Sequence, residues 1–293
     1  MQNKFSEKQF RERFPNDDAC LEEVKQLRYG DSLDCPKCIR HNSFYRVKGR
    51  TAYACSFCGH HIYPLKGSIF DHSSTPLTTW FYAIYLMAQT RSGMSAKTLE
   101  RMTGVTYKTA WRMFNRIRQL MAEDGMPLFG EVEVDEMYMH PDPTKNTRLK
   151  SKMPNKRFYD SEIVFGMVER GGRAKVVHVK SSGSRVLIPE IQKHVVPGAV
   201  VYSDEYRAYG KLAVWGFFHN TVKHKDAQYV NGTVHTQNIE NLWSNAKRGI
   251  RGVYRHVDAK YLQNYVDEYA FRYSYRKYPK QMFDLILSNV ARG

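Results

Sequence analysis

The sequence contains no apolar run long enough to cross a lipid bilayer. Its most apolar stretch, residues 77–88, is shorter than the roughly 20 residues that a membrane-spanning helix needs. We interpret it as a buried helix with Thr75 as its N-cap and Pro76 at its first position. The N-terminus lacks the apolar segment of a signal peptide, and no lipidation motif or basic amphipathic tail is present. These absences predict a cytoplasmic protein without a membrane partner.

Acidic residues are scarce relative to basic ones. Lys and Arg number 45 against 29 Asp and Glu, which gives a formal net charge of +16 and a pI near 9.6. Such an excess favours a polyanionic partner, because each phosphate that a basic side chain neutralises releases a counterion. The 293 residues contain no low-complexity segment, and their number suffices for more than one domain.

Cysteine is also scarce, yet four of the five cysteines form two Cys-x-x-Cys pairs separated by 16 residues. Two such pairs can supply four thiolates to one tetrahedral Zn2+. Residues 43–47 and 51–54, between the pairs, read as two short strands that would form the hairpin of a zinc ribbon. The predicted zinc ligands are Cys35, Cys38, Cys55 and Cys58.

Other interpretations of these cysteines compete with a single zinc site. Two unrelated redox pairs are less consistent with four cysteines in one small segment. Cys20 lies outside the pattern and is expected to be a buried apolar residue. His60 and His61 follow the second pair and could ligate, although four thiolates already complete a closed site. Basic residues in the ribbon suggest DNA as its partner, and a purely structural or protein-docking role stays open.

A helix-turn-helix motif is predicted after the buried helix. Residues 94–102 and 106–118 have helical spacing of apolar residues, and a turn around Gly104 separates them. The apolar residues expected to point inward are Leu99, Met102, Val105, Ala110, Trp111 and Phe114. The residues expected to face DNA, near the start of the second helix, are Thr106, Tyr107, Lys108 and Arg112. An ordinary pair of packed helices is the alternative interpretation.

Three acidic residues on separate segments form the most informative pattern of the chain. Asp135 lies in residues 131–138, whose alternation predicts a strand, and Asp204 ends a short apolar strand. Glu240 comes after 35 intervening residues, in a segment with helical spacing. Lys247 follows Glu240 by seven residues, which places the two about 20° apart around a helix axis.

Converging carboxylates can hold two divalent cations, which stabilise the attacking and leaving oxygens when a phosphodiester is substituted. The three acids are therefore the predicted metal ligands, and Lys247 is predicted to contact DNA phosphate. Glu131 and Glu133 share a strand face with Asp135, and such a row of like charges is costly unless solvent or a cation offsets it. For any one of these acids, an ordinary surface position is the alternative; spacing, context and the lysine together favour the metal site.

Three blocks that contain these residues resemble the catalytic blocks of DDE transposases from insertion sequences. They are residues 133–136, 202–209 and 235–248, and the similarity is closest to the group with an N-terminal zinc ribbon. The resemblance extends from about Cys35 to Arg276. It implies an RNase H-like core, two Mg2+ or Mn2+ per active site, and the cut-and-paste movement or copying of a DNA element with terminal inverted repeats.

The identity of the third metal ligand is open in this resemblance. Some members of the family use asparagine there, and Asn238 and Asn241 flank Glu240. We favour Glu240, because the asparagines lie about 100° or more away around the helix and because Mg2+ prefers anionic oxygen.

The order of the predicted elements fits an α/β, RNase H-like catalytic core preceded by a zinc ribbon and a helix-turn-helix module. The predicted elements are strands at 131–138, 163–168, 174–180, 199–204 and 217–223, and helices at 185–194, 240–247 and 259–278. Tyrosines recur along the last helix and are expected to pack against the sheet. The expected domains are an N-terminal helical segment at 1–30, the ribbon at 31–66, the helical module at 67–126 and the catalytic domain at 127–293.

Basic residues near the predicted metal site offer further contacts for DNA. Residues 145–157 carry six basic residues and no acid, which suits either a solvated loop or one that binds phosphate. The candidates from this loop are Lys150, Lys156 and Arg157, and Arg248 joins Lys247 on the helix of Glu240.

The sequence thus predicts a DNA transposase. The ribbon and the helical module would bind the element ends, as a homo-oligomer on DNA. The catalytic domain would hydrolyse a phosphodiester to free a 3′-OH and then join that hydroxyl to target DNA. Two alternatives remain: an RNase H-like nuclease that cuts without joining, and a zinc-ribbon DNA-binding regulator with an inactive core.

Overall fold

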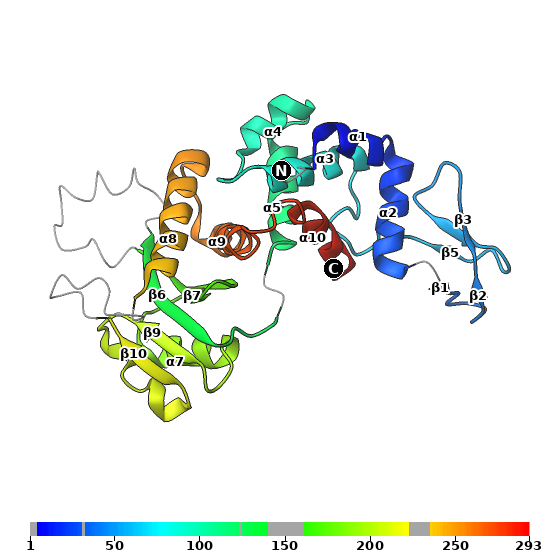
Figure 1. The fold of residues 1–293 in the computed structure, drawn as a ribbon. Helices are drawn as coiled ribbons and strands as arrows, with labels where there is room; N and C mark the ends of the chain where they lie inside the picture. Colours follow the sequence, from blue (N-terminus) through cyan, green and yellow to red (C-terminus); the bar gives the residue numbers. More distant parts are fainter. Residues whose placement is uncertain (1–4, 31–32, 123–124, 140–160, 223–234, 293) are drawn as a thin grey trace. The chain divides into compact units, whose positions relative to one another are not determined.

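The computed structural model describes residues 5–30, 33–122, 125–139, 161–222 and 235–292 (Figure 1). The chain folds as two compact units. The first comprises Met1–Thr90, Ala96–Leu120 and Tyr278–Gly293, and the second comprises Arg91–Ser95 and Met121–Lys277. The chain therefore passes between the units four times.

The first unit is mainly helical. Its helices are α1 (Glu7–Arg13), α2 (Asp17–Tyr29), α3 (Leu77–Gln89), α4 (Ala96–Thr103), α5 (Tyr107–Gln119), α10 (Met282–Ser288) and the short η4 (Asn289–Arg292). Aromatic side chains fill its core: the ring of Phe14 lies 4.9 Å from Phe81 and 5.8 Å from Phe283. Because Phe283 is fully buried there, the end of the chain packs with the N-terminal helices. The division expected at residue 126 had instead assigned the last residues to the catalytic domain.

Helix α3 is the predicted buried helix, with a different start. Pro76 occupies the N-cap position with an extended ψ of 144°, Leu77 is the first helical residue, and no side chain caps the helix. The prediction of Thr75 as N-cap was wrong; the backbone N–H of Thr75 donates to Ser73 instead. Proline has no N–H to satisfy, so the helix can begin directly after it. Within the described ranges, no helix is long and apolar enough to cross a membrane.

Short strands form the ribbon of the first unit. They are β1 (Leu33–Asp34), β2 (His41–Asn42), β3 (Phe44–Arg46), β4 (Tyr53–Cys55) and β5 (His61–Ile62). β1 pairs with β2, and β3, β4 and β5 form a separate antiparallel sheet. The hairpin predicted between the cysteine pairs is the pairing of β3 with β4. Arg46 on β3 forms an ion pair of 2.8 Å with Asp18 on α2.

Helices α4 and α5 occupy the segment predicted to form a helix-turn-helix. Gly104 between them has a φ of +74°, a conformation that glycine adopts without strain. Thr106 caps α5 by accepting a hydrogen bond from the N–H of Thr109. Of the residues expected inward, Leu99, Ala110 and Phe114 are buried. Val105 and Trp111 are half-buried.

Met102 was expected inward, and this prediction was wrong, because 48% of its surface is exposed. Helix α4 ends one residue later at Thr103, so Met102 lies on its last turn, away from the face that packs on α5 through Leu99. The buried face of α5 continues instead through Met113 and Ile117, one turn beyond Ala110 and Phe114.

A five-stranded mixed sheet forms the centre of the second unit. Its strands are β6 (Glu131–Met139), β7 (Glu162–Glu169), β8 (Ala174–Val179), β9 (Val200–Ser203) and β10 (Phe218–Thr221), in the order β10-β9-β6-β7-β8. β6, β7 and β8 form the predicted antiparallel meander. β9 runs parallel to β6, and β10 runs parallel to β9.

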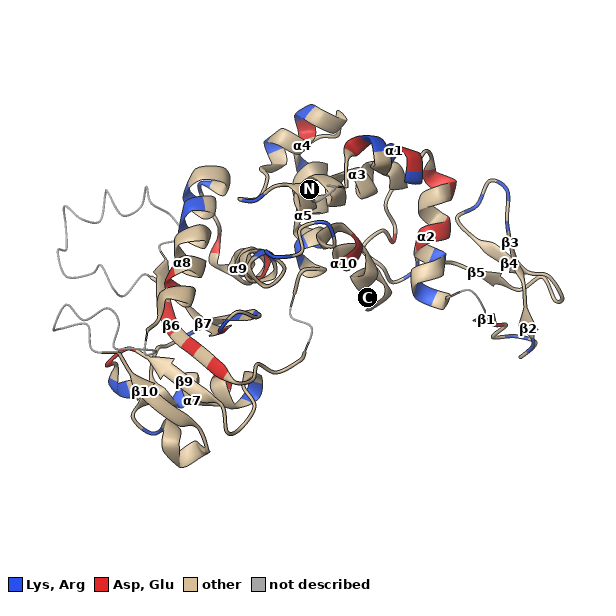
Figure 2. Cartoon of the chain, viewed as in Figure 1, with Lys and Arg blue, Asp and Glu red and all other residues tan. Residues whose placement is uncertain are grey.

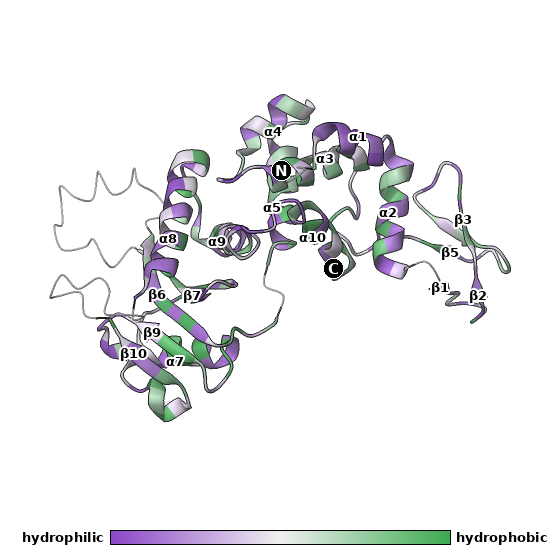
Figure 3. Cartoon of the chain, in the orientation of Figure 1, coloured by the Kyte–Doolittle hydropathy of each residue, from purple (hydrophilic) through white to green (hydrophobic). Residues whose placement is uncertain are grey.

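Helices cover both faces of this sheet. Helix α7 (Ser184–His194) packs on one face with the apolar residues Val132 and Val134 of β6. Helices α8 (Gln237–Gly249) and α9 (Ala259–Ser274) pack on the other face. Apolar and polar residues alternate along β6 in Figure 3, as expected for a strand whose two faces meet different layers.

The tyrosines of α9 are core residues, as expected from their helical spacing. Tyr265, Tyr269 and Tyr273 are buried with apolar residues of α8 and of the sheet. The described part of this unit also contains the short 3-10 helices η1 (Arg207–Tyr209) and η2 (Leu212–Trp215) and the π-helix η3 (Ile250–Tyr254), which continues α8.

Candidate active site and zinc site

The sheet brings Asp135 and Asp204 to neighbouring positions. In the parallel pairing of β6 with β9, Glu133 lies opposite Tyr202. Two residues further along both strands, Asp135 stands beside the position of Asp204, which directly follows β9. Parallel neighbours lie about 4.8 Å apart, so the backbone alone places the two carboxylates close together.

Helix α8 crosses this part of the sheet and contacts Asp135 directly. The indole N–H of Trp243 donates a hydrogen bond of 3.0 Å to Oδ2 of Asp135. The ring of Trp243 lies against Gly166, the residue of β7 that pairs with Asp135. A Cβ atom at residue 166 would lie only 2.4 Å from the ring, so glycine is required for this approach. Trp243 and Gly166 were not singled out from the sequence.

Glu240 lies in the first turn of α8 and is exposed. Its Oε1 accepts a hydrogen bond of 3.2 Å from the hydroxyl of Thr236. A groove of about 560 Å³ runs along the same helix, and its lining residues are Gln237, Glu240, Asn241, Ser244 and Arg248. Lys247 and Arg248 are exposed in the last turn, and basic residues gather at that end of α8 in Figure 2. The groove is thus acidic at one end and basic at the other.

Negative charge accumulates at the carboxylates. Burial raises the pKa of Asp135 to about 6; backbone and Trp243 hydrogen bonds oppose this shift, while the charges of Asp204 and Glu240 add to it. Burial likewise raises the pKa of Glu136 to about 7, against the hydrogen bond that it accepts from Tyr209. In the described parts of the chain, no lysine or arginine forms an ion pair with Asp135, Asp204 or Glu240.

These residues offer the donors that a hard divalent cation prefers, namely carboxylate oxygens. The oxygens of the three acids are not all within 4.8 Å of one another; among the described residues, only the four cysteines form a group that close. A pair of cations about 3.5–4 Å apart spans a wider set of ligands than one ion does. The donor chemistry is therefore compatible with Mg2+ or Mn2+.

Asn238 and Asn241, the alternative third ligands, have other partners. The side-chain amide of Asn238 donates to Glu133 at 2.9 Å, and its oxygen accepts from the hydroxyl of Tyr273 at 3.3 Å. The oxygen of Asn241 accepts from Asn245 at 2.9 Å. Among the described residues, the side chain of Glu240 accepts a hydrogen bond from Thr236 alone, so it is the freer of the three candidates.

The four predicted zinc ligands converge in the ribbon. Sγ of Cys35 lies 3.6 Å from that of Cys58, and Sγ of Cys38 lies 3.9 Å from that of Cys55. Four sulfurs around Zn2+ at about 2.3 Å would be about 3.8 Å apart, so the cluster fits a tetrahedral zinc. This is a zinc-binding cysteine cluster of the structural kind, with all four protein ligands in place.

The thiol pKa values differ among these cysteines. Although burial opposes it, hydrogen bonds from backbone N–H groups at Cys38 and Lys37 lower the pKa of Cys35 to about 6. Against a backbone hydrogen bond at His60, burial and hydrogen bonds with the neighbouring thiols raise the pKa of Cys58 to about 11. Burial raises the pKa of Cys20 to about 12, which agrees with its expected role as a buried apolar residue. A lowered pKa favours the thiolate that binds metal.

The predicted DNA contacts lie on separate elements. Thr106, Tyr107, Lys108 and Arg112 are exposed at the start of α5, in the first unit. The guanidinium of Arg248 on α8 is held by the backbone oxygen of Ser244 and by Asn245. Lys150, Lys156 and Arg157 lie outside the described residues.

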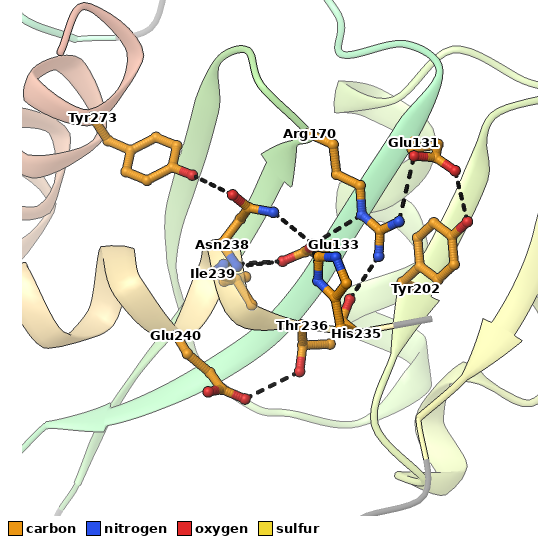
Figure 4. Close-up of polar contacts among 10 residues, drawn as sticks. All are labelled: Glu131, Glu133, Arg170, Tyr202, His235, Thr236, Asn238, Ile239, Glu240 and Tyr273. Carbon is orange, nitrogen blue, oxygen red and sulfur yellow. Dashed lines mark hydrogen bonds and ion pairs between the residues drawn. The ribbon is translucent and has the colours of Figure 1, made fainter. Parts of the chain in front are cut away.

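A buried carboxylate near the site was not identified as functional from the sequence. Glu133 contacts Arg170 and the start of α8 (Figure 4). Its only signal in the sequence is its place in the row of acids on β6, two residues before Asp135.

Known families and proteins resemble this chain over most of its length. Residues 127–274 match the family described as ISXO2-like transposase domain, and residues 15–61 match the transposase zinc-ribbon domain. An uncharacterised protein in transposable element ISH50 of Halobacterium salinarum is 30% identical over 286 residues, which cover 91% of this chain and 94% of that protein. An uncharacterised transposase-like protein of Haemophilus influenzae is 28% identical over 122 residues, or 40% of this chain and 92% of that protein.

Proposed function

The chain belongs to the ISXO2-like transposases of insertion sequences, and we propose that it cuts and joins DNA by two-metal catalysis at Asp135, Asp204 and Glu240. One observation carries this proposal: the register of β6 and β9 sets Asp135 beside Asp204, and α8 contacts Asp135 through Trp243. The charge of Glu240, one turn earlier on α8, contributes to the raised pKa of Asp135.

The topology of the second unit supports an RNase H-like core. Three antiparallel strands are followed by a helix and by two strands that add in parallel beside the first. β6 and β9, the first and fourth strands of this unit, are neighbours in the sheet; Asp135 lies on β6 and Asp204 directly follows β9. The third acid arrives on a helix that packs over that face.

Each residue has a defined role in the proposed reaction. Asp135 and Asp204 would hold the metals, Glu240 would complete the set, and Lys247 would position a phosphate. When bound, two divalent cations supply the positive charge that stabilises the attacking and leaving oxygens. Trp243 keeps Asp135 oriented through its hydrogen bond. Water is the nucleophile of the cutting step and the DNA 3′-OH that of the joining step, without a covalent enzyme intermediate.

DNA would be held by both units. The exposed start of α5, with Thr106, Tyr107, Lys108 and Arg112, is the proposed recognition surface of a helix-turn-helix. The groove along α8 leads from Glu240 to Arg248 and suits one sugar-phosphate strand. Because a transposase must handle two element ends, we expect a homo-oligomer on DNA.

The proposal is tested with DNA that carries the ends of the host element. We expect release of a 3′-OH at the end and joining to a second duplex in the presence of Mg2+ or Mn2+. Cleavage without any joining would support the nuclease alternative. Binding of the ends without cleavage by the wild-type chain would support the regulator alternative.

Two matched substitutions test the third ligand. Glu240→Gln keeps the shape of the side chain and removes its charge, and it should lower cleavage by roughly a hundredfold or more while end binding is kept. Asn241→Ala, on the next residue of the same helix, should retain much more activity. An inactive Asn241→Ala beside a near wild-type Glu240→Gln would move the ligand to Asn241.

A further inference from the structure

Glu133 is a buried acid whose two oxygens are both fully engaged. The side chain has no exposed surface. Oε2 accepts from the backbone N–H groups of Asn238 at 2.8 Å and Ile239 at 3.1 Å. Oε1 accepts from Nε of Arg170 at 2.9 Å and from the side-chain amide of Asn238 at 2.9 Å. Four donors leave no lone pair for a metal ion, so Glu133 is not a candidate ligand.

A guanidinium and an imidazole lie next to the buried charge. Arg170 lies beside Glu133, and Nδ1 of His235 is 3.3 Å from Oε1. Arg170 itself is held on several sides: it donates to the backbone oxygen of His235 at 2.8 Å, and its guanidinium lies 3.8 Å from the ring centre of Tyr202. Burying a carboxylate is costly unless it is paired and hydrogen-bonded in this way.

The bonds to Asn238 and Ile239 replace an ordinary helix cap. Thr236 is the N-cap residue of α8, but its side chain makes no capping bond. In most helices the N-cap side chain accepts from the second or third backbone N–H of the helix. Here the carboxylate of Glu133, from a different element, accepts from both (Figure 4). Its negative charge also lies at the positive end of the helix dipole.

The freed hydroxyl of Thr236 has another partner. It donates to Oε1 of Glu240, one turn into α8. Glu133 therefore caps α8 in place of Thr236, and Thr236 orients the exposed carboxylate of Glu240. Asn238 is held a second time from α9, by the hydroxyl of Tyr273.

These contacts connect two parts of the proposed metal site. Glu133 precedes Asp135 by two residues on β6, and Asn238 precedes Glu240 by two residues on α8. We propose that Glu133 is a positioning residue that fixes the start of α8 on β6, and thereby fixes Glu240 relative to Asp135. The proposal rests on the metal site proposed above.

The full-length chain offers a matched pair of substitutions. Glu133→Gln removes the charge and turns an amide toward donors that need an acceptor. Glu131→Gln removes the same charge two residues earlier on the same strand. Glu131 is exposed and also contacts Arg170, at 3.4 Å, and Tyr202, at 2.8 Å, and among the described residues neither of these polar contacts involves α8.

Two measurements report on the effect. Mn2+ affinity is measured by calorimetry on chelator-treated protein reloaded with zinc, and it should weaken about tenfold or more in Glu133→Gln, as for other residues that orient metal ligands. The 19F resonance of 5-fluorotryptophan at Trp243, assigned with Trp243→Phe, reports the position of α8 on Asp135 and should shift or broaden. Both readings should stay near wild type in Glu131→Gln.

The outcomes separate this proposal from the one on which it rests. Equal Mn2+ affinity in the wild type and in Asp135→Asn would overturn the metal site, while the Trp243 resonance would still decide whether Glu133 holds α8. An unchanged resonance and affinity in Glu133→Gln would overturn the role of Glu133. If Glu133→Gln does not fold, Asn238→Ala decides: it removes one of the four bonds and should give a smaller change in both readings, and no change would refute the proposal.

Discussion

Gly166→Ala should displace α8 from the candidate active site. An added Cβ would lie 2.4 and 2.5 Å from two ring carbons of Trp243 and 3.2 Å from Ile239. Carbon atoms pack at about 3.5–4.0 Å, so the ring must retreat by about 1 Å. The hydrogen bond from Trp243 to Asp135, now 3.0 Å, would then be lost or strongly weakened.

The magnitude follows from these contacts. Overpacking costs about 1–3 kcal/mol, and a hydrogen bond to a charged group contributes about 1.5–3 kcal/mol. Alanine regains about 0.5–1 kcal/mol because it restricts the unfolded chain more than glycine does. We expect the free energy of unfolding to fall by roughly 2–4 kcal/mol, which corresponds to roughly 5–15 °C in Tm. Cleavage should fall by up to about a hundredfold, since 1 Å of misplacement can cost that much.

Thermal unfolding and a cleavage assay measure both effects. Gly252→Ala is the matched control, because nothing lies within 4 Å of a Cβ at that position, and it should change stability by less than about 0.5 kcal/mol. Combining Gly166→Ala with Trp243→Phe should relieve the clash, so the double variant should be less destabilised than the sum of the two. Additivity within about 0.5 kcal/mol would refute the packing of Trp243 against Gly166.

Three further predictions concern the zinc site, the recognition helix and the acid cluster. The chain should hold one Zn2+, and Cys58→Ser should lose it and unfold the ribbon; elemental analysis that finds no zinc in the wild type would contradict this. Lys108→Ala should weaken binding of element ends. If Lys108 contacts a base, the loss should be about 1–3 kcal/mol with relaxed specificity at one base pair; if it contacts a phosphate, binding should weaken equally for all sequences and the slope of log affinity against log salt should fall by about one. Unchanged binding and salt dependence would exclude α5 as the recognition helix. Because the pKa of Asp135 is raised to about 6 in the fold, the folded state favours the protonated side chain. The stability that this protonation contributes is lost as the pH rises through 6. In chelator-treated protein Asp135→Asn should therefore raise Tm at pH 8 and change it little at pH 4. The gain in the free energy of unfolding at pH 8 should be about 3 kcal/mol at most. An equal change at both pH values would contradict the origin in charge.

Much of the fold could be predicted from local patterns. Alternation identified β6, β7 and β8, and helical spacing identified α7, α8 and the buried tyrosines of α9. These features depend on residues close together in the chain, and so does the cysteine cluster. Single positions at the ends of helices were less predictable: Pro76 replaced Thr75 as N-cap, and Met102 is exposed on the last turn of α4.

The site itself depends on contacts between distant segments. The level of Asp204 beside Asp135 follows from a parallel register that the sequence does not show. Asn238 differs from Glu240 as a candidate ligand because its side chain is bonded to Glu133 and Tyr273, which lie far away in the sequence. Glu133 was one acid in a row, and its burial under the start of α8 distinguishes it from the exposed Glu131 two residues before. For each of these residues the informative neighbour lies roughly 35 or more positions away in the chain.

The path of the chain between the two units has a consequence for how such genes can be recombined. A fusion that joined the first 126 residues to the catalytic core of another element would leave helix α10 behind, and with it the Phe283 ring that packs against Phe10 and Phe14. The other fragment would lose Ser92, whose backbone oxygen accepts from Tyr269, and Gly93, which lies against Tyr254. Each half would thus carry a hole in its core. Exchange of DNA-binding specificity between related elements is therefore expected to proceed by substitution on the surface of α5, and rarely by the swapping of whole domains.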